Sequence, residues 1–349
     1  MLKKILFIGL GGAGQRHLRL FKKELDGKNV EFIAYRTTNK TPLLNPDFTV
    51  NKKGSIQSTY GIRIFEKLSE ALELKPELAI ISTPSSMHLQ YAKLCIENGI
   101  NVFIEKPLSD SLNGIQKLKE LRNRNKVNIQ VGYQRRFHPH ISKVKDIVQA
   151  GDLGRILTVN FTVASYIPRW HPYENFLDLY ACRKELGGGV LLTEIHEIDL
   201  AVWYFGEPIS VVCVGGTYSN VGMDVEDTVR LTLDYLKFSV QINLTFWQKY
   251  QERFFSISGE NGYLCWDQDD DTLTQKYFNR SDQNIVEQTI KLGVDAMFET
   301  QVKSIIKNLD YRSNEQVIND SLVALKIVEA AKKSMQTKRV IMLSEIKNG

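Results

Sequence analysis

The chain has 349 residues and a formal net charge of +5, with 43% hydrophobic and 24% charged residues. These proportions are typical of a globular protein, and the length suits two domains better than one. The 45 basic and 40 acidic residues nearly balance and form no run of like charge, so binding to nucleic acid or a membrane surface is not indicated. No segment approaches the roughly 20 apolar residues of a membrane span. The four cysteines lie far apart without zinc-ligand spacing, so we expect no metal site and a reducing, cytoplasmic location.

The first segment that points to a function is KKILFIGLGGAGQRHL, residues 3–18. An apolar run at 5–8 predicts a strand, and a helical pattern begins at Gln15. Between them Gly9, Gly11 and Gly14 match G-x-G-x-x-G in the strand–helix context that this motif requires. Gly9 permits the tight turn, Gly11 lets the backbone approach a pyrophosphate, and Gly14 allows close helix–strand packing. The helix N-terminus offers N–H groups to phosphate. We therefore predict a dinucleotide-binding loop formed by Gly9, Gly11, Gly12, Ala13 and Gly14.

Strands and helices alternate up to about residue 133. Strands are predicted at 30–35, 62–65, 78–83, 101–104 and 128–133, and helices at 67–74, 88–98 and 112–123, whereas 41–61 is polar and irregular. This alternation predicts a parallel, doubly wound sheet. We place this first, dinucleotide-binding domain at residues 1–125.

The end of the second predicted strand bears on the choice of cofactor. An NAD-binding fold usually has an acidic residue here for the ribose hydroxyls, but this chain has Arg36 and Thr37. An arginine followed by hydroxyl groups suits the 2′-phosphate of NADP(H). NADP(H) is therefore favoured and NAD(H) is possible; the alternative is a solvated loop arginine.

Two other strand ends carry polar residues at the edge where parallel sheets bind ligands. Thr83 and Pro84 end one strand, and His88 begins the next helix. Glu105-Lys106-Pro107 follows another strand, and a cis proline there would aim Lys106 into the cleft. A lysine so placed can bond the cofactor ribose and polarise a substrate hydroxyl or carbonyl, although most lysines are merely solvated. The predicted cofactor contacts from these strand ends are Thr83, Pro84, His88, Glu105 and Lys106.

Beyond about residue 125 the pattern changes. Residues 228–235 and 238–246 alternate between apolar and polar side chains, and 259–262 forms a turn between 255–258 and 263–266. Helices are expected at 295–308 and 314–335. Residues 126–349 therefore predict an α+β domain with an antiparallel sheet, one face of which is wet or covered by a partner.

The second candidate for chemistry is the segment 187–199, GGGVLLTEIHEID. Three glycines before a helix let its N-terminal end approach a ligand closely. His196 and Asp199 are three residues apart and so share a helix face. Histidine is the natural group to accept or return a proton near neutral pH. The alternative is a structural histidine tied to Asp199.

The loop that precedes these glycines, residues 166–184, is rich in aromatic side chains. Aromatic rings stack on sugars, and histidine, tyrosine and arginine bind hydroxyls, carboxylates or phosphates. We predict substrate contacts from His171, Tyr173 and Arg183, with Arg136 as a weaker candidate. Ordinary packing of an aromatic loop under the sheet is the alternative.

Together these motifs resemble the Gfo/Idh/MocA oxidoreductases, which include glucose–fructose oxidoreductase and inositol dehydrogenases. The resemblance covers about residues 1–210, where the motifs follow in the expected order: the glycine loop, Thr83-Pro84 with His88, Glu105-Lys106-Pro107, Arg136-Phe137 with Pro139, and the triple glycine with His196. It implies a Rossmann domain followed by a domain with a large open antiparallel sheet, whose face often builds dimers or tetramers. It also implies NAD(P)-dependent oxidation or reduction at one carbon of a sugar, sugar nucleotide or cyclitol. Lys106 matches the family's lysine, and His196 its catalytic histidine.

One position departs from that family. Its members commonly have an aspartate four residues before the histidine, where this chain has Leu192, which cannot hold a sugar hydroxyl. Glu194 would lie about 200° from His196 around a helix, so it is a poor replacement for the aspartate. Thr193 lies nearer the helix face that carries His196. Either Lys106 and His196 suffice, or Thr193 and a residue of the preceding loop complete the site. Some sugar-nucleotide branches of the family also lack the aspartate, which favours such substrates.

The sequence thus predicts a cytoplasmic oxidoreductase that moves a hydride between a nicotinamide and a hydroxyl carbon of a sugar, sugar nucleotide or cyclitol. His196 is expected to accept the hydroxyl proton and Lys106 to orient the reactants, with Thr193 and Asp199 as further substrate contacts. A homodimer or homotetramer through the second domain's sheet is expected. Two alternatives stay open: an NAD-dependent glycoside hydrolase of the same family with tightly held cofactor, and a non-catalytic NADP(H)-binding sensor without a buried polar pocket around His196.

Overall fold

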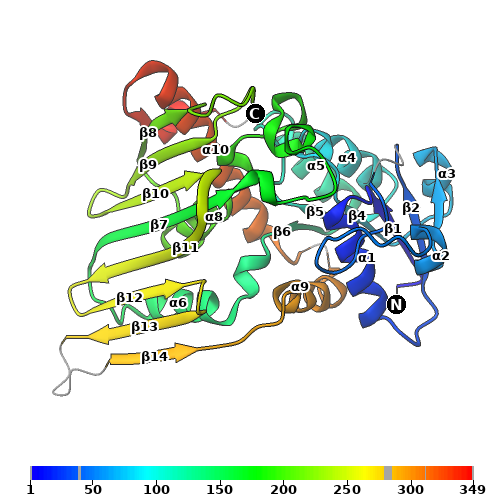
Figure 1. Cartoon of the computed structure of the whole chain (residues 1–349), viewed down its shortest axis with the longest axis horizontal. Helices are drawn as coiled ribbons and strands as arrows, with labels where there is room; N and C mark the ends of the chain where they lie inside the picture. Colours follow the sequence, from blue (N-terminus) through cyan, green and yellow to red (C-terminus); the bar gives the residue numbers. More distant parts are fainter. Residues whose placement is uncertain (1, 38–40, 279–284, 311, 348–349) are drawn as a thin grey trace.

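The computed structural model describes residues 2–37, 41–278, 285–310 and 312–347, which build two sheets with helices against them (Figure 1). The first sheet has six parallel strands in the order β3-β2-β1-β4-β5-β6. Since the chain turns from β2 on one side of β1 to β4 on the other, the carboxyl ends of β1 and β4 form the edge where doubly wound sheets bind ligands. The strands are β1 (Lys4–Ile8), β2 (Glu31–Tyr35), β3 (Arg63–Phe65), β4 (Leu78–Ile81), β5 (Asn101–Glu105) and β6 (Ile129–Gly132).

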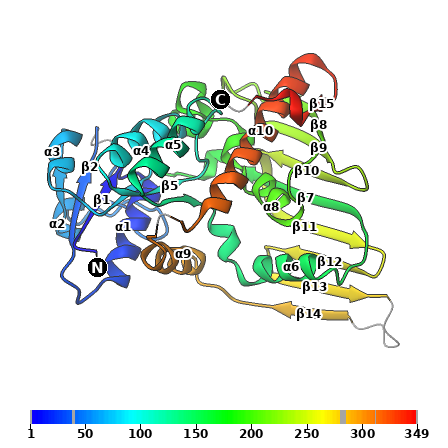
Figure 2. The ribbon, with the colours of Figure 1, turned by 180° about the vertical axis from the view of Figure 1, so that it is seen from behind.

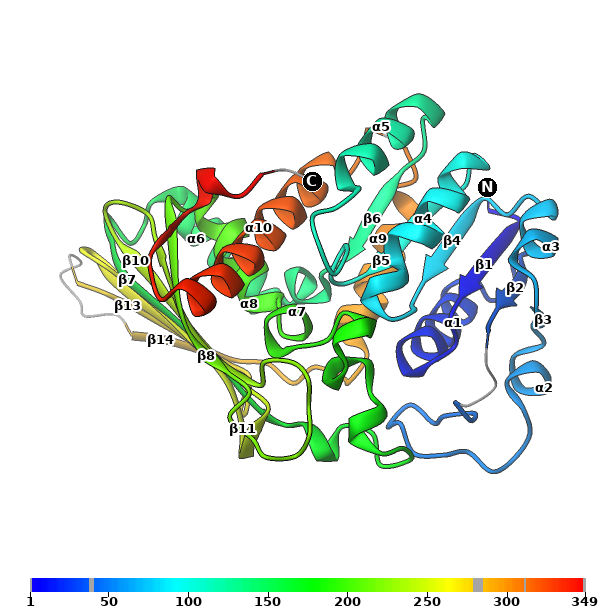
Figure 3. The ribbon, with the colours of Figure 1, turned by 90° about the horizontal axis from the view of Figure 1, so that it is seen from above.

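Helices cover both faces of this sheet (Figure 3). Helices α4 (His88–Glu97) and α5 (Ile115–Asn125) pack on one face, and α1 (Gly12–Glu24) packs on the other. The central strands are accordingly apolar throughout, and residues 5–8 of β1 are fully buried. The short helices α2 (Ile56–Tyr60) and α3 (Leu68–Glu73) flank β3.

The second sheet has nine strands in the order β14-β13-β12-β11-β7-β10-β9-β8-β15. Neighbouring strands are antiparallel except β7 and β10, which are parallel. Its strands are β7 (Ile156–Tyr166), β8 (Ser210–Gly216), β9 (Thr228–Asp234), β10 (Ser239–Thr245), β11 (Trp247–Gly259), β12 (Gly262–Asp267), β13 (Thr272–Tyr277), β14 (Ile285–Thr289) and β15 (Ile341–Met342). The predicted α/β fold, a doubly wound sheet followed by a large and mainly antiparallel one, is confirmed.

One face of the large sheet carries α6 (Pro139–Ala150), α8 (His196–Phe205) and α10 (Glu315–Thr337), as Figure 2 shows. No helix of the described residues covers the other face (Figure 3). The side chains alternate accordingly: Val229, Leu231 and Leu233 of β9 are buried, whereas Arg230 is exposed. None of the helices described is both long and apolar enough to cross a membrane.

Two features differ from the expected organisation. Strand β6 lies beyond residue 125 and pairs with β5, so the change of sheet comes after Gly132. The chain later returns to the first domain: Val302 and Ile305 of α9 (Ala296–Lys307) pack in one core with Phe7 and Phe21.

The single helix expected after the triple glycine is instead two helices. Helix α7 (Val190–Thr193) ends at Glu194, and α8 begins at His196. Angles counted around one continuous helix therefore do not apply across this break, and the estimate that placed Thr193 near the face of His196 loses its basis.

Candidate active site

The glycine loop between β1 and α1 has the shape that a pyrophosphate requires. A Cβ at Gly9 would lie 2.8 Å from the Ser82 carbonyl oxygen, and one at Gly14 would overlap the carbonyl oxygen of Gly9. These two glycines are thus needed for packing. A Cβ at Gly11 would meet no atom within 4 Å, so the backbone there faces open space. The donors of this loop, with the buried and unpartnered Thr83 hydroxyl, fit a dinucleotide phosphate group.

Gly12 lies under an aromatic cluster from both halves of the chain. A Cβ at Gly12 would lie 2.8 Å from the Phe48 ring and 3.7 Å from the Tyr173 hydroxyl. The ring centroids of Phe48 and His171 are 6.1 Å apart, and those of His171 and Tyr173 are 5.2 Å apart. The structure therefore places His171 and Tyr173 beside the cofactor loop. Glu174 accepts a hydrogen bond from His171 at 2.7 Å when Nδ1 is protonated.

Arg36 lies at the end of β2, where the adenosine ribose is expected. Its guanidinium donates to the Thr41 carbonyl at 3.1 Å, and burial lowers its pKa. Thr37 is exposed. No carboxylate follows at positions 36 and 37, so the strand end retains the positive character that suggested a 2′-phosphate.

The His88 side chain lies between the loops that follow β4 and β5. Its buried ring lies between two carbonyl oxygens, with Nδ1 2.7 Å from that of Pro107 and Nε2 2.9 Å from that of Thr83. Burial lowers the pKa of this imidazole. A neutral imidazole donates from one nitrogen only, so His88 hydrogen-bonds one of these two carbonyl oxygens and packs against the other. Pro107 follows a cis peptide bond, as the sequence suggested.

Glu105 is held by a residue that the sequence analysis did not single out. The carboxylate of Glu105 pairs with His17 of α1 at 2.5 Å, and it also accepts the backbone N–H of Lys106 at 3.1 Å. His17 is fully buried and packs edge-on against Phe103 and Phe298. Its place three residues after Gly14 on α1, on the buried side of the helix, is the signal that could have revealed it.

Lys106 crosses from the first half of the chain to the second. Its Nζ donates to the Thr193 carbonyl at 2.5 Å, three residues before His196. The Ser85 hydroxyl makes a parallel link, donating to the Gly187 carbonyl at 2.8 Å. These bonds fix the lysine against the segment that carries the histidine.

His196 is buried, with 3% of its surface exposed. The Gln134 amide donates through Nε2 to His196 Nε2 at 3.2 Å, while His196 Nδ1 has no hydrogen-bond partner in the described residues. Burial, followed by the charges of Lys106, Arg135 and Arg253, lowers the imidazole pKa well below 6.5. The histidine is therefore neutral at physiological pH and able to accept a proton.

Further buried polar atoms around His196 lack partners within the part of the chain that the structure describes. They are Gln134 Oε1, Arg135 Nε, Thr193 Oγ1 and Glu197 Oε2. Buried polar groups in folded proteins are normally hydrogen-bonded. A cluster of unsatisfied buried polar atoms beside His196 suits hydrogen bonding to a polyhydroxylated ligand.

The Asp199 carboxylate is hydrogen-bonded to Arg136 and, among the described residues, not to His196. Its carboxylate accepts two hydrogen bonds from Arg136, at 2.6 and 2.9 Å, and Arg136 also pairs with Asp320 at 2.9 Å. Asp199 is fully buried. The structure thus engages Arg136 and Asp199 with each other, which also leaves His196 untied to Asp199.

The remaining candidates of the second domain lie as follows. Arg183 pairs with Glu185 at the surface. Leu192 is buried, Thr193 presents its carbonyl to Lys106, and the three glycines pack against protein: a Cβ at Gly187, Gly188 or Gly189 would overlap Ser85, the Tyr180 carbonyl or Glu226 respectively. Their close approach therefore serves chain packing.

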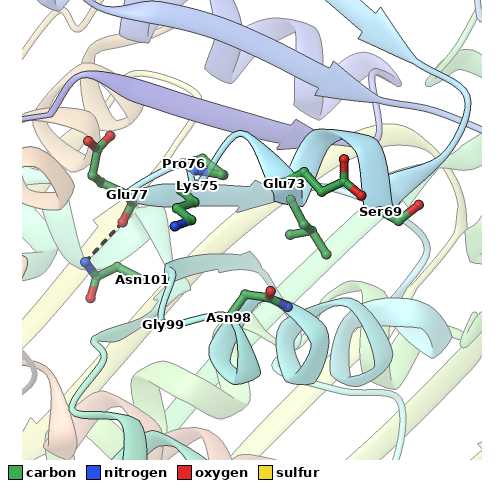
Figure 4. A pocket seen from close by; sticks show the side chains of 9 residues that line it. Ser69, Glu73, Lys75, Pro76, Glu77, Asn98, Gly99 and Asn101 are labelled. Carbon is green, nitrogen blue, oxygen red and sulfur yellow. Dashed lines mark hydrogen bonds between the residues drawn. The ribbon is translucent and has the colours of Figure 1, made fainter.

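A separate hollow lies at the opposite edge of the first sheet, where β4 and β5 begin (Figure 4). Glu77, which lines it, accepts the backbone N–H groups of Lys3 and Lys4, and Asn101 donates to the Glu77 carbonyl at 3.1 Å. This hollow is far from the ligand-binding edge. Within the described ranges, no group of three or more His, Cys, Asp or Glu side chains could hold a metal ion.

Comparisons with known proteins agree with this geometry. Residues 3–133 match the family model described as "Oxidoreductase family, NAD-binding Rossmann fold", and residues 141–265 match the "GFO/IDH/MocA C-terminal domain". The chain belongs to the Gfo/Idh/MocA family. The resemblance drawn from the motifs is thus confirmed, together with the NAD(P)-binding Rossmann domain that it implied.

Curated relatives of this family member carry dehydrogenase names. It is 33% identical over 164 residues to the scyllo-inositol 2-dehydrogenase (NAD(+)) of Bacillus subtilis, covering 46% of this chain and 45% of that protein. It is 26% identical over 214 residues to the inositol 2-dehydrogenase of Leifsonia xyli, covering 59% and 56%. The matched region thus spans only about half the length of these relatives.

Solved structures share the fold over almost the whole chain. A putative NADPH-dependent oxidoreductase from Desulfitobacterium hafniense aligns with a TM-score of 0.78 and 18% identity, covering 98% of both chains. The myo-inositol 2-dehydrogenase of Lactobacillus plantarum aligns with a TM-score of 0.75 and 19% identity, covering 98% and 99%. At these identities the likeness concerns the fold.

Proposed function

We propose that this protein is an NAD(P)-dependent oxidoreductase that acts on a hydroxyl-bearing carbon of a sugar, sugar nucleotide or cyclitol. The observation that carries the proposal is that Lys106 and His196, from different domains, lie together beside a cluster of unpartnered buried polar atoms at the ligand-binding edge of the first sheet. Relatives named inositol 2-dehydrogenase and glucose-6-phosphate 3-dehydrogenase support this substrate class.

The residues divide the work of such a reaction. Bound NAD(P) supplies the hydride acceptor, held by the glycine loop and by the ends of β4 and β5. Neutral His196 accepts the proton of the substrate hydroxyl at Nε2, where this hydroxyl replaces the Gln134 amide as the donor. The Lys106 ammonium stabilises the negative charge that develops on that oxygen. In the reverse direction the same histidine returns the proton.

For the cofactor we propose NADP(H) over NAD(H), because Arg36 stands where NAD-binding folds usually have a carboxylate. Arg36→Ala should weaken NADPH binding by about tenfold, the scale of one charge-assisted contact, and leave NADH binding unchanged. Fluorescence titration of both nucleotides measures this. An equal loss for the two would show that Arg36 does not read the 2′-phosphate.

The uncovered face of the large sheet is proposed to bind a second copy of the chain. Val212 and Val214 of β8 are 37% and 63% exposed on that face, and exposed apolar side chains of this kind suit association. Sedimentation of the purified protein should give a dimer or tetramer. We also propose a cytoplasmic location, because all four cysteines are free thiols.

The decisive experiment is a panel of sugars, cyclitols and sugar nucleotides assayed by nicotinamide absorbance with NAD and NADP in parallel. Turnover with a net change in absorbance supports the dehydrogenase. Consumption of a glycoside without a net change, by protein that retains nucleotide after purification, would identify the hydrolase alternative instead. Nucleotide binding without any turnover would favour a sensor.

A further inference from the structure

Several charged side chains surround His196. Three cations, Lys106, Arg135 and Arg253, act on its imidazole. Arg253 is neutralised, because it pairs with Glu194 and lies 3.5 Å from the Glu197 carboxylate. Neither Lys106 nor Arg135 forms an ion pair within the described residues, and Lys106 donates to a neutral carbonyl oxygen.

Arg135 is the cation without an assigned role. It belongs to the short 3₁₀ turn Gln134–Phe137 after β6, beside the glutamine that contacts His196. One terminal nitrogen donates to the neutral Gln268 amide oxygen at 2.9 Å, while its Nε is buried and has no partner among the residues that the structure describes. Burial, and then repulsion from Arg253, lowers the pKa of Arg135 to about 9. A buried donor and a poorly compensated charge both cost free energy that an oxyanion would recover.

The carboxylates of Glu197, Glu194 and Asp271 lie near enough to Arg135 to oppose this lowering of its pKa, but none of them forms an ion pair with it within the described residues. Asp271 accepts the Trp266 indole N–H at 3.0 Å and pairs with His138 at 3.1 Å. Glu194 and Glu197 face Arg253. The protein itself therefore does not satisfy the buried Nε of this guanidinium.

We propose that the substrate of this site carries an oxyanion, either a carboxylate or a phosphate, which Arg135 binds while Lys106 and His196 act on a neighbouring hydroxyl carbon. The inference rests on the proposed function and narrows it to acidic sugars or cyclitols. Arg135 donates from Nε to one oxygen of this group, and the ligand adds to the compensation that Glu197, Glu194 and Asp271 give to its charge.

Three sugars that differ only at C6 test the proposal: D-glucose, D-glucuronate and D-glucose 6-phosphate. Each is titrated by calorimetry into the protein with NAD(P)H bound, so that no turnover occurs. At least one acid should bind at least about tenfold more tightly than glucose, as expected for a charge-assisted contact. The acid that wins distinguishes a carboxylate from a phosphate.

Variants assign the preference to the side chain. Arg135→Leu should abolish the preference for the acid over glucose, and Arg135→Lys should keep part of it. Arg155→Leu is the matched control, because Arg155 is 62% exposed and pairs with Glu260. Thermal melting confirms that each variant folds; where Leu does not, the Lys variant and Arg135→Gln serve.

Each outcome has a definite meaning. Equal affinity for all three sugars, or a preference that survives Arg135→Leu, overturns this inference while leaving the dehydrogenase intact. If neither these sugars nor any member of the wider panel binds, the proposed function itself fails. A supporting readout is the pH profile: a bound anion offsets the cations, so the acid should raise the apparent pKa of His196, and glucose should not.

Discussion

Two glycine-rich segments frame the site, and they do opposite things. In the loop 9–14 of the first domain, Gly11 leaves space that no protein atom fills. In the segment 187–189 of the second domain, a Cβ at any of the three glycines would strike protein. In the first segment Gly11 leaves room for a ligand while Gly9, Gly12 and Gly14 pack against protein, whereas in the second all three glycines let loop 180–189 fold tightly against Ser85 and Glu226. Glycine composition alone does not tell these uses apart; the space beside each Cα does.

The largest expected effect tests whether the two segments serve one reaction. Lys106 stands at the edge that the first segment defines, and His196 follows the second. Lys106→Ala and His196→Ala should each reduce turnover by at least ~100-fold, the contribution of one positioned acid–base or charged group. Steady-state kinetics on the best substrate of the panel measures it. Wild-type rates in both variants would show that Lys106 and His196 do not act in one reaction and would refute the proposed function.

The next largest expected effect concerns Asp199, which follows the second segment in helix α8. Asp199→Asn weakens the buried pair with Arg136, and about 2 kcal/mol of unfolding free energy should be lost. This is less than the roughly 3–5 kcal/mol for losing a sole partner, because Asp320 remains. Urea denaturation measures the loss, with exposed Asp26→Asn as control. A higher KM at unchanged stability would instead show that Asp199 holds substrate.

The glycines themselves give the sharpest contrast. Gly188→Ala forces a Cβ into backbone carbonyls and should cost about 1–3 kcal/mol of stability. Gly11→Ala meets no protein atom, so its melting temperature should be unchanged while its affinity for the dinucleotide falls about tenfold. Gly293→Ala, also in open space, is the control for both measurements. Unchanged dinucleotide affinity in Gly11→Ala would show that the pyrophosphate does not bind against Gly11.

The smallest effect is the response to pH. Burial and three cations hold the pKa of His196 well below 6.5, so kcat/KM for oxidation should stay level down to about pH 6.5 and decline only at more acidic pH. The unfolded chain takes up this proton near pH 6.5 and the folded chain does not, so the unfolding free energy should decrease as pH falls below that value. Denaturation at pH 7 and 5.5 should show a smaller decrease in His196→Gln than in wild type.

The sequence was most informative where the contacts are local. Gly9, Gly11 and Gly14, with an apolar run before them and a helical pattern after them, predict the strand–turn–helix. Alternation of apolar and polar residues predicts the strands around 228–246. The long-range partners could not be predicted. No neighbouring residue of Asp199 in the sequence predicts its ion pair with Arg136, 63 residues away. The same holds for the pair of Glu105 with His17, 88 residues away.

The helix after the triple glycine shows the same limit. Periodicity favoured one continuous helix, but α7 ends at Thr193 and α8 begins at His196. At this break Glu194 pairs with Arg253 of β11, and the Thr193 carbonyl accepts from Lys106. Both partners are distant in the chain, so residue spacing could not reveal these bonds.

The return of α9 to the first domain has a consequence for dissecting the molecule. Arg16 and Arg19 of α1 meet Asp295 at 3.1 and 2.8 Å, and Val302 and Ile305 complete the apolar layer beneath Phe7 and Phe21. A fragment that stops after β6 would expose that layer to water. The dinucleotide-binding half is therefore not autonomous, and an excised N-terminal piece should aggregate unless residues 295–308 are supplied in trans.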